Sequence, residues 1–195
     1  MNTWNINGKI LEFIEDEHIY LYNGMIVPSV TQILSCKFKD EYSRISKKVL
    51  ENAAAKGTAL HEAIEMYERE GQDCNLIEFK NYLFLKDRKH FKNIDNEVPV
   101  VYIKNGKALY VGRLDQIIMI GGKLAINDFK RVSAPNKEKI AYQLNLYKLA
   151  YEQTYNKKIE ALYFTHLREE VRKFVPLPIN EKAALELVDQ YYKGE

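Results

Sequence analysis

Two apolar runs joined by a pair of glycines constrain the fold of this chain more than any other feature of its sequence. Residues 108–120 precede Gly121-Gly122 and residues 124–129 follow it, and both runs are strand-like. Two glycines readily adopt the positive φ angles of a two-residue primed turn, so the sequence predicts an antiparallel hairpin. Both strands are apolar on both faces, which is typical of a covered sheet. We therefore expect this hairpin at the centre of the fold.

Charged side chains interrupt this otherwise apolar hairpin. In the register set by the glycine turn, Asp115 lies opposite Asp128, where side chains approach within roughly 5 Å. Lys130 follows Asp128 by two residues and projects from the same face of its strand. Facing carboxylates destabilise a ladder unless a cation lies between them, and Mg²⁺ takes carboxylate oxygens. The alternative is a solvent-exposed polar edge on which Lys130 and Arg113 neutralise the aspartates, but the apolar neighbours favour a metal site.

The rest of the chain predicts helices and further strands around the hairpin. Ser29 is the expected N-cap of a short helix, and Lys56-Gly57-Thr58 is expected to separate two others. Strand-like runs cover 9–14, 18–22, 25–27, 98–103, 161–167 and 171–175, and helical spacing covers 40–55, about 60–69, 76–91, 138–155 and 180–192. We expect one α/β domain over residues 1–195, with a central mixed β-sheet flanked by helices and a β-meander at about 1–27 packed on it.

Composition excludes several classes of protein. The 195 residues are 46% hydrophobic and 29% charged, as in globular proteins, and no apolar run approaches the ~18 residues of a membrane helix. Cys36 and Cys74 are too few to frame a disulfide scaffold or to form a zinc site alone. The net charge of +2 gives no global electrostatic argument for a nucleic-acid or membrane partner. Because no secretion signal is visible, we expect a cytoplasmic protein without membrane association.

Five short motifs follow one another between residues 28 and 151. They are Pro28-Ser29-Val30-Thr31-Gln32-Ile33-Leu34, Gly57-Thr58-Ala59-Leu60-His61, Gly112-Arg113-Leu114-Asp115, Asp128-Phe129-Lys130 and Gln143-x-x-x-Tyr147. Together they resemble the PD-(D/E)XK nuclease superfamily, in the branch that includes the RecB nuclease domain and the mitochondrial genome maintenance exonuclease. The resemblance implies a restriction-endonuclease-like core and a Mg²⁺- or Mn²⁺-dependent deoxyribonuclease. An exonuclease on linear DNA is expected, of the kind phages and mobile elements use in recombination or end processing, which would place it in the bacterial host cytoplasm.

The same resemblance implies roles for individual residues. The metal ligands would be Asp115, Asp128, the backbone carbonyl of Phe129 and His61, and Lys130 would orient the attacking water. Glu97 and Glu65 are further candidate ligands, and Gln143 and Tyr147 would border the active site. Simpler explanations are a surface histidine for His61, an ion pair between Glu65 and Arg69, and a buried Tyr147 hydrogen-bonded by Gln143.

Substrate contacts are expected from local clusters of positive charge. One run includes Lys86, Arg88 and Lys89, and a second includes Lys47 and Lys48. Either run could follow the phosphates of DNA, although a solvated helix face is the commoner explanation. The aromatic residues available to stack on bases are Tyr42, Tyr82, Phe84 and Phe91.

Several departures from the family pattern limit what the resemblance implies. No proline precedes Asp115, and the four cysteines that hold an iron-sulfur cluster in some relatives are missing, so no cluster is expected. No phosphate-binding loop is present, so a helicase or a single-strand annealing partner would be a separate chain. A homo-oligomer, a non-catalytic DNA-binding protein with the same fold, and an endonuclease or RNA-directed nuclease with the same metal site stay open as alternatives.

Overall fold

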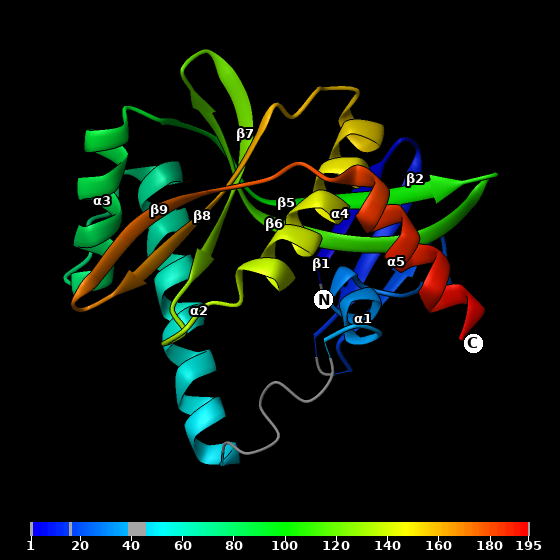
Figure 1. Ribbon diagram of the computed structural model, residues 1–195, viewed down its shortest axis with the longest axis horizontal. Helices are drawn as coiled ribbons and strands as arrows, with labels where there is room; N and C mark the ends of the chain where they lie inside the picture. The colour runs from blue at the N-terminus through cyan, green and yellow to red at the C-terminus, as the bar shows by residue number, and fades with distance from the viewer. Residues whose placement is uncertain (1, 16, 39–45, 195) are drawn as a thin grey trace.

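A five-stranded mixed sheet forms the centre of the computed structural model, which describes residues 2–15, 17–38 and 46–194 (Figure 1). Its strands are β5 (Lys92–Lys104), β6 (Lys107–Ile120), β7 (Lys123–Lys130), β8 (Ala161–Arg168) and β9 (Val171–Leu177), which neighbour one another in that order. All neighbours are antiparallel except β7 and β8, which are parallel. The chain is thus an α/β protein with a mixed sheet, as the sequence predicts.

The β6–β7 hairpin has the turn and the register that the glycine pair predicts. Gly121 and Gly122 both have positive φ angles, 56° and 77°. Ile120 pairs with Lys123, and the register continues without a shift to the pair Gln116 and Asn127. The predicted hairpin is therefore confirmed from the turn as far as the pair Gln116 and Asn127, next to the two aspartates.

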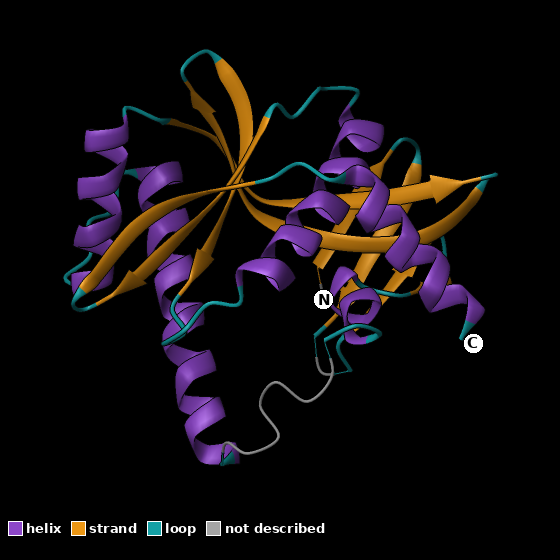
Figure 2. Cartoon of the chain, viewed as in Figure 1, coloured by secondary structure: helices purple, strands orange, loops and turns teal. Residues whose placement is uncertain are grey.

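Helices cover the sheet in two groups, as Figure 2 shows. The helices α2 (Lys47–Glu70) and α3 (Ile77–Lys89) pack with β7 and β8 in a cluster that includes Leu60, Tyr82 and Phe129. The second group comprises α1 (Val30–Ser35), α4 (Lys137–Tyr155) and α5 (Glu181–Lys193), and its cluster includes Leu114 and Leu144. Burying each such side chain contributes about 1.5–3 kcal/mol, so the two clusters hold the sheet between the helix groups.

The N-terminal meander packs against the β5–β6 hairpin. It has four strands, β1 (Asn2–Ile6), β2 (Lys9–Ile14), β3 (Ile19–Tyr22) and β4 (Met25–Val27), of which the sequence predicted the last three. Leu11 and Tyr22 lie in one cluster with Val101 and Val111. The chain then enters α1, where Ser29 forms the expected N-cap and, with Gln32, a capping box.

Two of the predicted boundaries are wrong. The predicted break at Lys56-Gly57-Thr58 does not occur, because α2 runs through Gly57 without interruption to its C-cap at Gly71. One glycine costs a helix only about 1 kcal/mol, and the alanines at 53–55 are the best helix formers. The start of the helix predicted from residue 40 lies outside the described residues. The strand predicted from Val98 begins earlier, at Lys92, which places Glu97 inside β5.

No helix in the described part of the chain is both long enough and apolar enough to span a membrane.

Candidate metal centre

The candidate site lies where β6 and β7 separate. Their ladder ends at the pair Gln116 and Asn127, while β6 stays paired with β5 and β7 stays paired with β8 as far as Lys130. Asp115 and Asp128 are the next residues in this register, so they lie in the fork between the two strands. The expected direct pairing in the ladder is therefore wrong. Instead, the Phe129 N–H donates a hydrogen bond to Asp115 Oδ2 at 2.8 Å.

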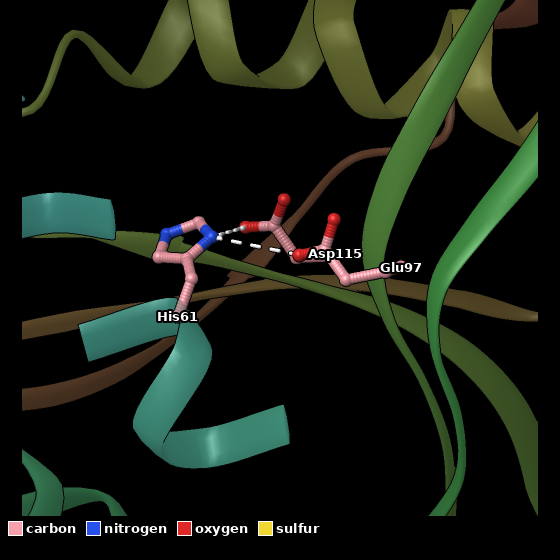
Figure 3. A group of neighbouring side chains, drawn as sticks. All are labelled: His61, Glu97 and Asp115. Carbon is pink, nitrogen blue, oxygen red and sulfur yellow. Dashed lines mark ion pairs between the residues drawn. The ribbon is translucent and has the colours of Figure 1, made fainter. Parts of the chain in front are cut away.

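Three side chains from three elements meet at this fork (Figure 3). His61 comes from α2, Glu97 from β5 and Asp115 from β6, and one ligand atom of each lies within 4.8 Å of the others. His61 Nδ1 is 3.7 Å from Asp115 Oδ2 and 3.9 Å from Glu97 Oε1. The ring of His61 also packs edge-on against Phe129, with 5.4 Å between the ring centroids. The sequence predicted all three as candidate ligands.

The backbone of Glu97 is unusual. Its φ angle is 52°, in the left-handed region that side chains other than glycine rarely adopt. The neighbouring pairs Asn96 with Gln116 and Val98 with Leu114 hold it opposite Asp115. Such strain costs on the order of 1–3 kcal/mol and concentrates at functional sites. The strained residue Glu97 therefore lies at the candidate site, with its carboxylate 3.9 Å from His61 Nδ1.

Arg113 holds Glu97 in place, a role that sequence reasoning missed. Arg113 Nε lies 2.6 Å from Glu97 Oε2. The sequence analysis considered this arginine only as a neutraliser of the aspartates. Its spacing of two residues before Asp115, which puts both on one face of β6, was the signal that could have found it.

Asp128 is the most buried charged group of the site. Its side chain is 1% exposed, and Lys130 Nζ lies 2.6 Å from its Oδ2. The lysine approaches Oδ2, while Oδ1 accepts no hydrogen bond from any residue that the structure describes. A buried carboxylate with spare acceptor capacity is costly unless a further positive group approaches it. The predicted proximity of Asp128 and Lys130 is thus present, and the pair leaves room for another partner.

Electrostatics couple these groups. Burial alone would lower the pKa of His61, but the carboxylates of Asp115 and Glu97 outweigh it and raise the pKa to about 9. Burial and the nearby charge of Asp115 together raise the pKa of Asp128 to about 6, although the charge of Lys130 opposes them. A pKa of about 9 keeps His61 protonated at neutral pH, so its positive charge faces the carboxylates of Asp115 and Glu97.

Tyr147 and Gln143 reach the site from α4. Tyr147 is buried, and Gln143 forms a side-chain hydrogen bond with its phenol. Burial, followed by the charge of Asp115, raises the pKa of the Tyr147 phenol far above its ordinary value, so it stays neutral. A Cβ on Gly112 would come within 2.6 Å of Tyr147 Cε1, so only glycine allows this packing. The glycine of the Gly112-Arg113-Leu114-Asp115 motif is thus explained by the position of the tyrosine.

Two other predicted ligands, Glu65 and the Phe129 carbonyl, are not among the clustered side chains. Glu65 forms an ion pair with Arg69 at 2.7 Å, which is the simpler of the two interpretations of this residue, and it is not among the three clustered ligands. For Phe129, the structure gives the N–H a partner, and a metal-binding role of its carbonyl stays a prediction.

The two basic runs contain both lysines held in ion pairs and exposed side chains. Lys86 is paired with Glu68 at 2.6 Å, whereas Arg88 and Lys89 are exposed. Lys47 pairs with Glu51, and it lies 14 residues before His61 on α2, roughly 21 Å along the helix axis. Of the aromatic candidates, Tyr82 and Phe91 are buried, Phe84 is exposed and Tyr42 lies outside the described residues. Tyr82 and Phe91 are therefore wrong as residues that stack on bases, while a substrate contact by Lys86 stays a prediction.

The donor set suits a divalent cation with a preference for oxygen. One imidazole and two carboxylates converge, and the buried Asp128 adds an Oδ1 oxygen that accepts no hydrogen bond from the described residues. Mg²⁺ and Mn²⁺ accept such oxygen-rich sets, whereas zinc and copper favour more nitrogen or sulfur. The residues present thus fit the predicted metal on their own chemistry.

Comparison with known proteins supports the fold alone. Neither a family model nor a curated protein matches the sequence. Among solved structures, the chain is similar to SSO0001, with a TM-score of 0.52 and 16% sequence identity over 87% of this chain and 76% of that one. At this identity the likeness concerns the arrangement of helices and strands and carries no statement about activity.

Proposed function

We propose that this protein is a divalent-metal-dependent nuclease that hydrolyses phosphodiester bonds in DNA and acts from the ends of linear molecules. One observation supports it most: His61, Glu97 and Asp115 cluster within 4.8 Å beside the buried pair of Asp128 and Lys130. The sequence resemblance to the PD-(D/E)XK superfamily supports the same chemistry, because its motifs include His61, Asp115 and the segment Asp128-Phe129-Lys130.

Each residue has a distinct task in this proposal. His61, Glu97, Asp115 and Asp128 would hold a Mg²⁺ or Mn²⁺ ion, and that ion, when bound, supplies Lewis-acid stabilisation of the phosphate. The Lys130 ammonium orients a water and offsets the negative charge that develops on the phosphate oxygens. Arg113 fixes Glu97 through its 2.6 Å contact.

The α4 side of the site sets the shape of the proposed centre. Because the Tyr147 phenol stays neutral, it adds no charge beside Asp115, and its O–H can act as a hydrogen-bond donor. Gln143 fixes the orientation of this phenol. The two residues therefore act as positioning groups on the α4 side of the site.

The decisive experiment uses end-labelled linear single-stranded and double-stranded DNA and a closed circle, with Mg²⁺, with Mn²⁺ and with chelator. The wild type is compared with Lys130→Ala, and Lys123→Ala serves as a matched control because this exposed lysine begins the same strand. We expect metal-dependent degradation by wild type and Lys123→Ala, and a loss on the order of 10²-fold or more in Lys130→Ala.

The pattern of substrates separates the remaining alternatives. Degradation of linear DNA with the circle left intact supports exonuclease action, and the order of label release gives the polarity. Cutting of the circle would replace the proposal with an endonuclease. Equal degradation by wild type and Lys130→Ala, or none by either, would refute the catalytic proposal and leave a DNA-binding protein with this fold.

A further inference from the structure

A groove of about 440 Å³ lies between the second half of α3 and the edge strand β9, outside the candidate metal centre. Figure 1 shows the two elements side by side at the end of the sheet away from α5, and they are in contact. The residues that give the groove its chemistry are Phe84, Arg88 and Lys89 from α3, and Arg172, Lys173 and Phe174 from β9.

The groove carries four positive charges that the protein does not neutralise. Arg88, Lys89, Arg172 and Lys173 are all exposed, and none of them forms an ion pair with another described residue. Lys86 on the same helix shows the contrast, because it is held at 2.6 Å by Glu68. The chain has a net charge of only +2, so this groove concentrates positive charge locally. Unpaired cations in a concave surface favour a polyanion.

An exposed aromatic ring lies among these cations. Phe84 is 40% exposed, and the Arg172 guanidinium carbon lies 3.8 Å from its ring centroid, with that of Arg88 at 6.0 Å. An arginine stacked on an aromatic ring presents a flat face and free N–H donors at the same time. Nucleic acid bases stack on such faces, while phosphates bind the donors.

The wall of the groove is preorganised by stacked rings. Phe174 stacks on Phe91, with centroids 5.4 Å apart, and on Tyr163 at 4.4 Å. Contacts between rings continue from Phe91 through Tyr82 to Phe129, which packs against His61. The groove therefore belongs to the same packed cluster as the α2 side of the metal centre while remaining a separate surface.

We propose that this groove binds single-stranded nucleic acid, with bases stacked on Phe84 and Arg172 and phosphates bound by Arg88, Lys89 and Lys173. Unstacked bases are available only in a single strand, which is why a duplex fits less well. The inference goes beyond the proposed nuclease activity, since such binding requires neither the metal nor the residues of the metal centre.

The test measures the fluorescence anisotropy of a short labelled oligothymidylate in the presence of chelator, so that cleavage plays no part. We expect Phe84→Ala to weaken binding at least about 5-fold, which is the lower limit for loss of one base stack. Arg88→Glu combined with Arg172→Glu should weaken it at least about 10-fold and reduce the dependence of affinity on salt concentration. Lys157→Glu combined with Lys158→Glu, in an exposed turn elsewhere, is the control matched for charge.

The outcomes decide the proposal whether or not the protein is a nuclease. Weaker binding in both groove variants, with the control close to wild type and all melting temperatures unchanged, supports the groove. No binding by the wild type, or equal loss in the control, overturns it. A duplex or polyglutamate that binds as tightly as the oligonucleotide, without dependence on Phe84, would also overturn it, because the groove would then be a general polyanion surface. None of these results depends on activity, so failure of the nuclease proposal is detected separately.

Discussion

Two buried carboxylates beside the β6–β7 hairpin differ in how well the protein satisfies them. The Glu68 side chain is 5% exposed, and its oxygens accept hydrogen bonds from Tyr82 at 2.6 Å and from Lys86 at 2.6 and 2.7 Å. The Asp128 side chain is 1% exposed, yet only its Oδ2 has a close cationic partner, Lys130 Nζ at 2.6 Å, and its Oδ1 accepts no hydrogen bond from the described residues. Glu68 therefore has its hydrogen-bond partners within the fold, whereas Asp128 has an oxygen that can still accept a cation from outside.

The satisfied carboxylate begins a chain of buried polar groups. Gln116 donates to Tyr82 at 2.8 Å, Asn127 donates to Gln116 at 2.9 Å, and Thr165 donates to Asn127 at 2.7 Å. Gln116 and Asn127 form the last pair of the ladder and adjoin the two site aspartates. The network therefore fixes the point where the strands separate, and the under-satisfied Asp128 lies just beyond it.

The largest effect is expected from replacing Asp128 with asparagine. Loss of a metal-holding carboxylate should lower nuclease activity on the order of 10³-fold, equivalent to about 4 kcal/mol in the transition state. The same substitution should not lower the free energy of unfolding. Because the pKa of Asp128 is about 6 when folded and lower when unfolded, the folded protein binds more protons between about pH 4 and 6. Stability of the wild type therefore falls as pH rises through this window.

Asp128→Asn removes that titration and should be at least as stable as the wild type above pH 6. Thermal melts from pH 4 to 8, combined with the DNA degradation assay, test both parts. An asparagine variant that melts well below the wild type at pH 7 would show that Asp128 is a structural carboxylate like Glu68.

The next effect concerns metal affinity and pH. His61 has a pKa of about 9 in the metal-free site and must lose its proton to bind a metal. Affinity for Mn²⁺ should therefore rise with pH between about 7 and 9, up to roughly tenfold per unit, and level off above that range. Calorimetric titration of the wild type and His61→Gln measures this, and the variant should lose the pH dependence as well as affinity. An equal slope in the variant would assign the proton to another group.

Glu68→Gln tests whether the satisfied carboxylate contributes to stability and not to activity. The amide leaves Lys86 without its charge partner and should cost about 2 kcal/mol of unfolding free energy. Glu62→Gln on the same helix is the matched control, since Glu62 is exposed, and it should stay within about 0.5 kcal/mol of wild type. Chemical denaturation gives both values, and residual activity of folded Glu68→Gln should remain near that of the wild type. A loss of activity as large as that of Asp128→Asn would remove the distinction between the two carboxylates.

Local sequence signals were sufficient for the hairpin and insufficient for the surfaces around it. The glycine pair at 121 and 122 fixes a short-range register, which is why the pairing could be predicted as far as Gln116 and Asn127 but not beyond, where the strands separate. The break expected at Gly57 was wrong because a long helix tolerates one glycine whose neighbourhood is open. A propensity acts on a few residues, and cooperative helix formation can override it.

The features that the sequence did not predict depend on contacts between segments distant in the chain. Arg172 and Lys173 meet Arg88 only because β9 and α3 pack together, and nothing near them in the sequence indicates this. The strained φ of Glu97 likewise depends on its position opposite Asp115 in β5 and β6. The three clustered candidate ligands are residues 61, 97 and 115, so their approach is a property of the fold rather than of any one motif.

The tyrosines beside the two carboxylates also differ in their packing. The smallest effect that we predict comes from changing the packing of Tyr147. Tyr82 hydrogen-bonds to Glu68, whereas Tyr147 lies beside the metal centre against Gly112. An alanine Cβ at position 112 would lie 2.6 Å from Tyr147 Cε1, closer than carbon atoms pack, so the ring must move. Gly112→Ala should therefore cost about 1–2 kcal/mol of stability. It should also lower kcat more than it raises KM, because a displaced ring no longer shapes the site around the transition state. Combination with Tyr147→Phe leaves the clash in place, while combination with Tyr147→Ala should restore stability. If the double variant Gly112→Ala/Tyr147→Ala is less stable than Tyr147→Ala alone, the glycine is required by the strand and not by the tyrosine.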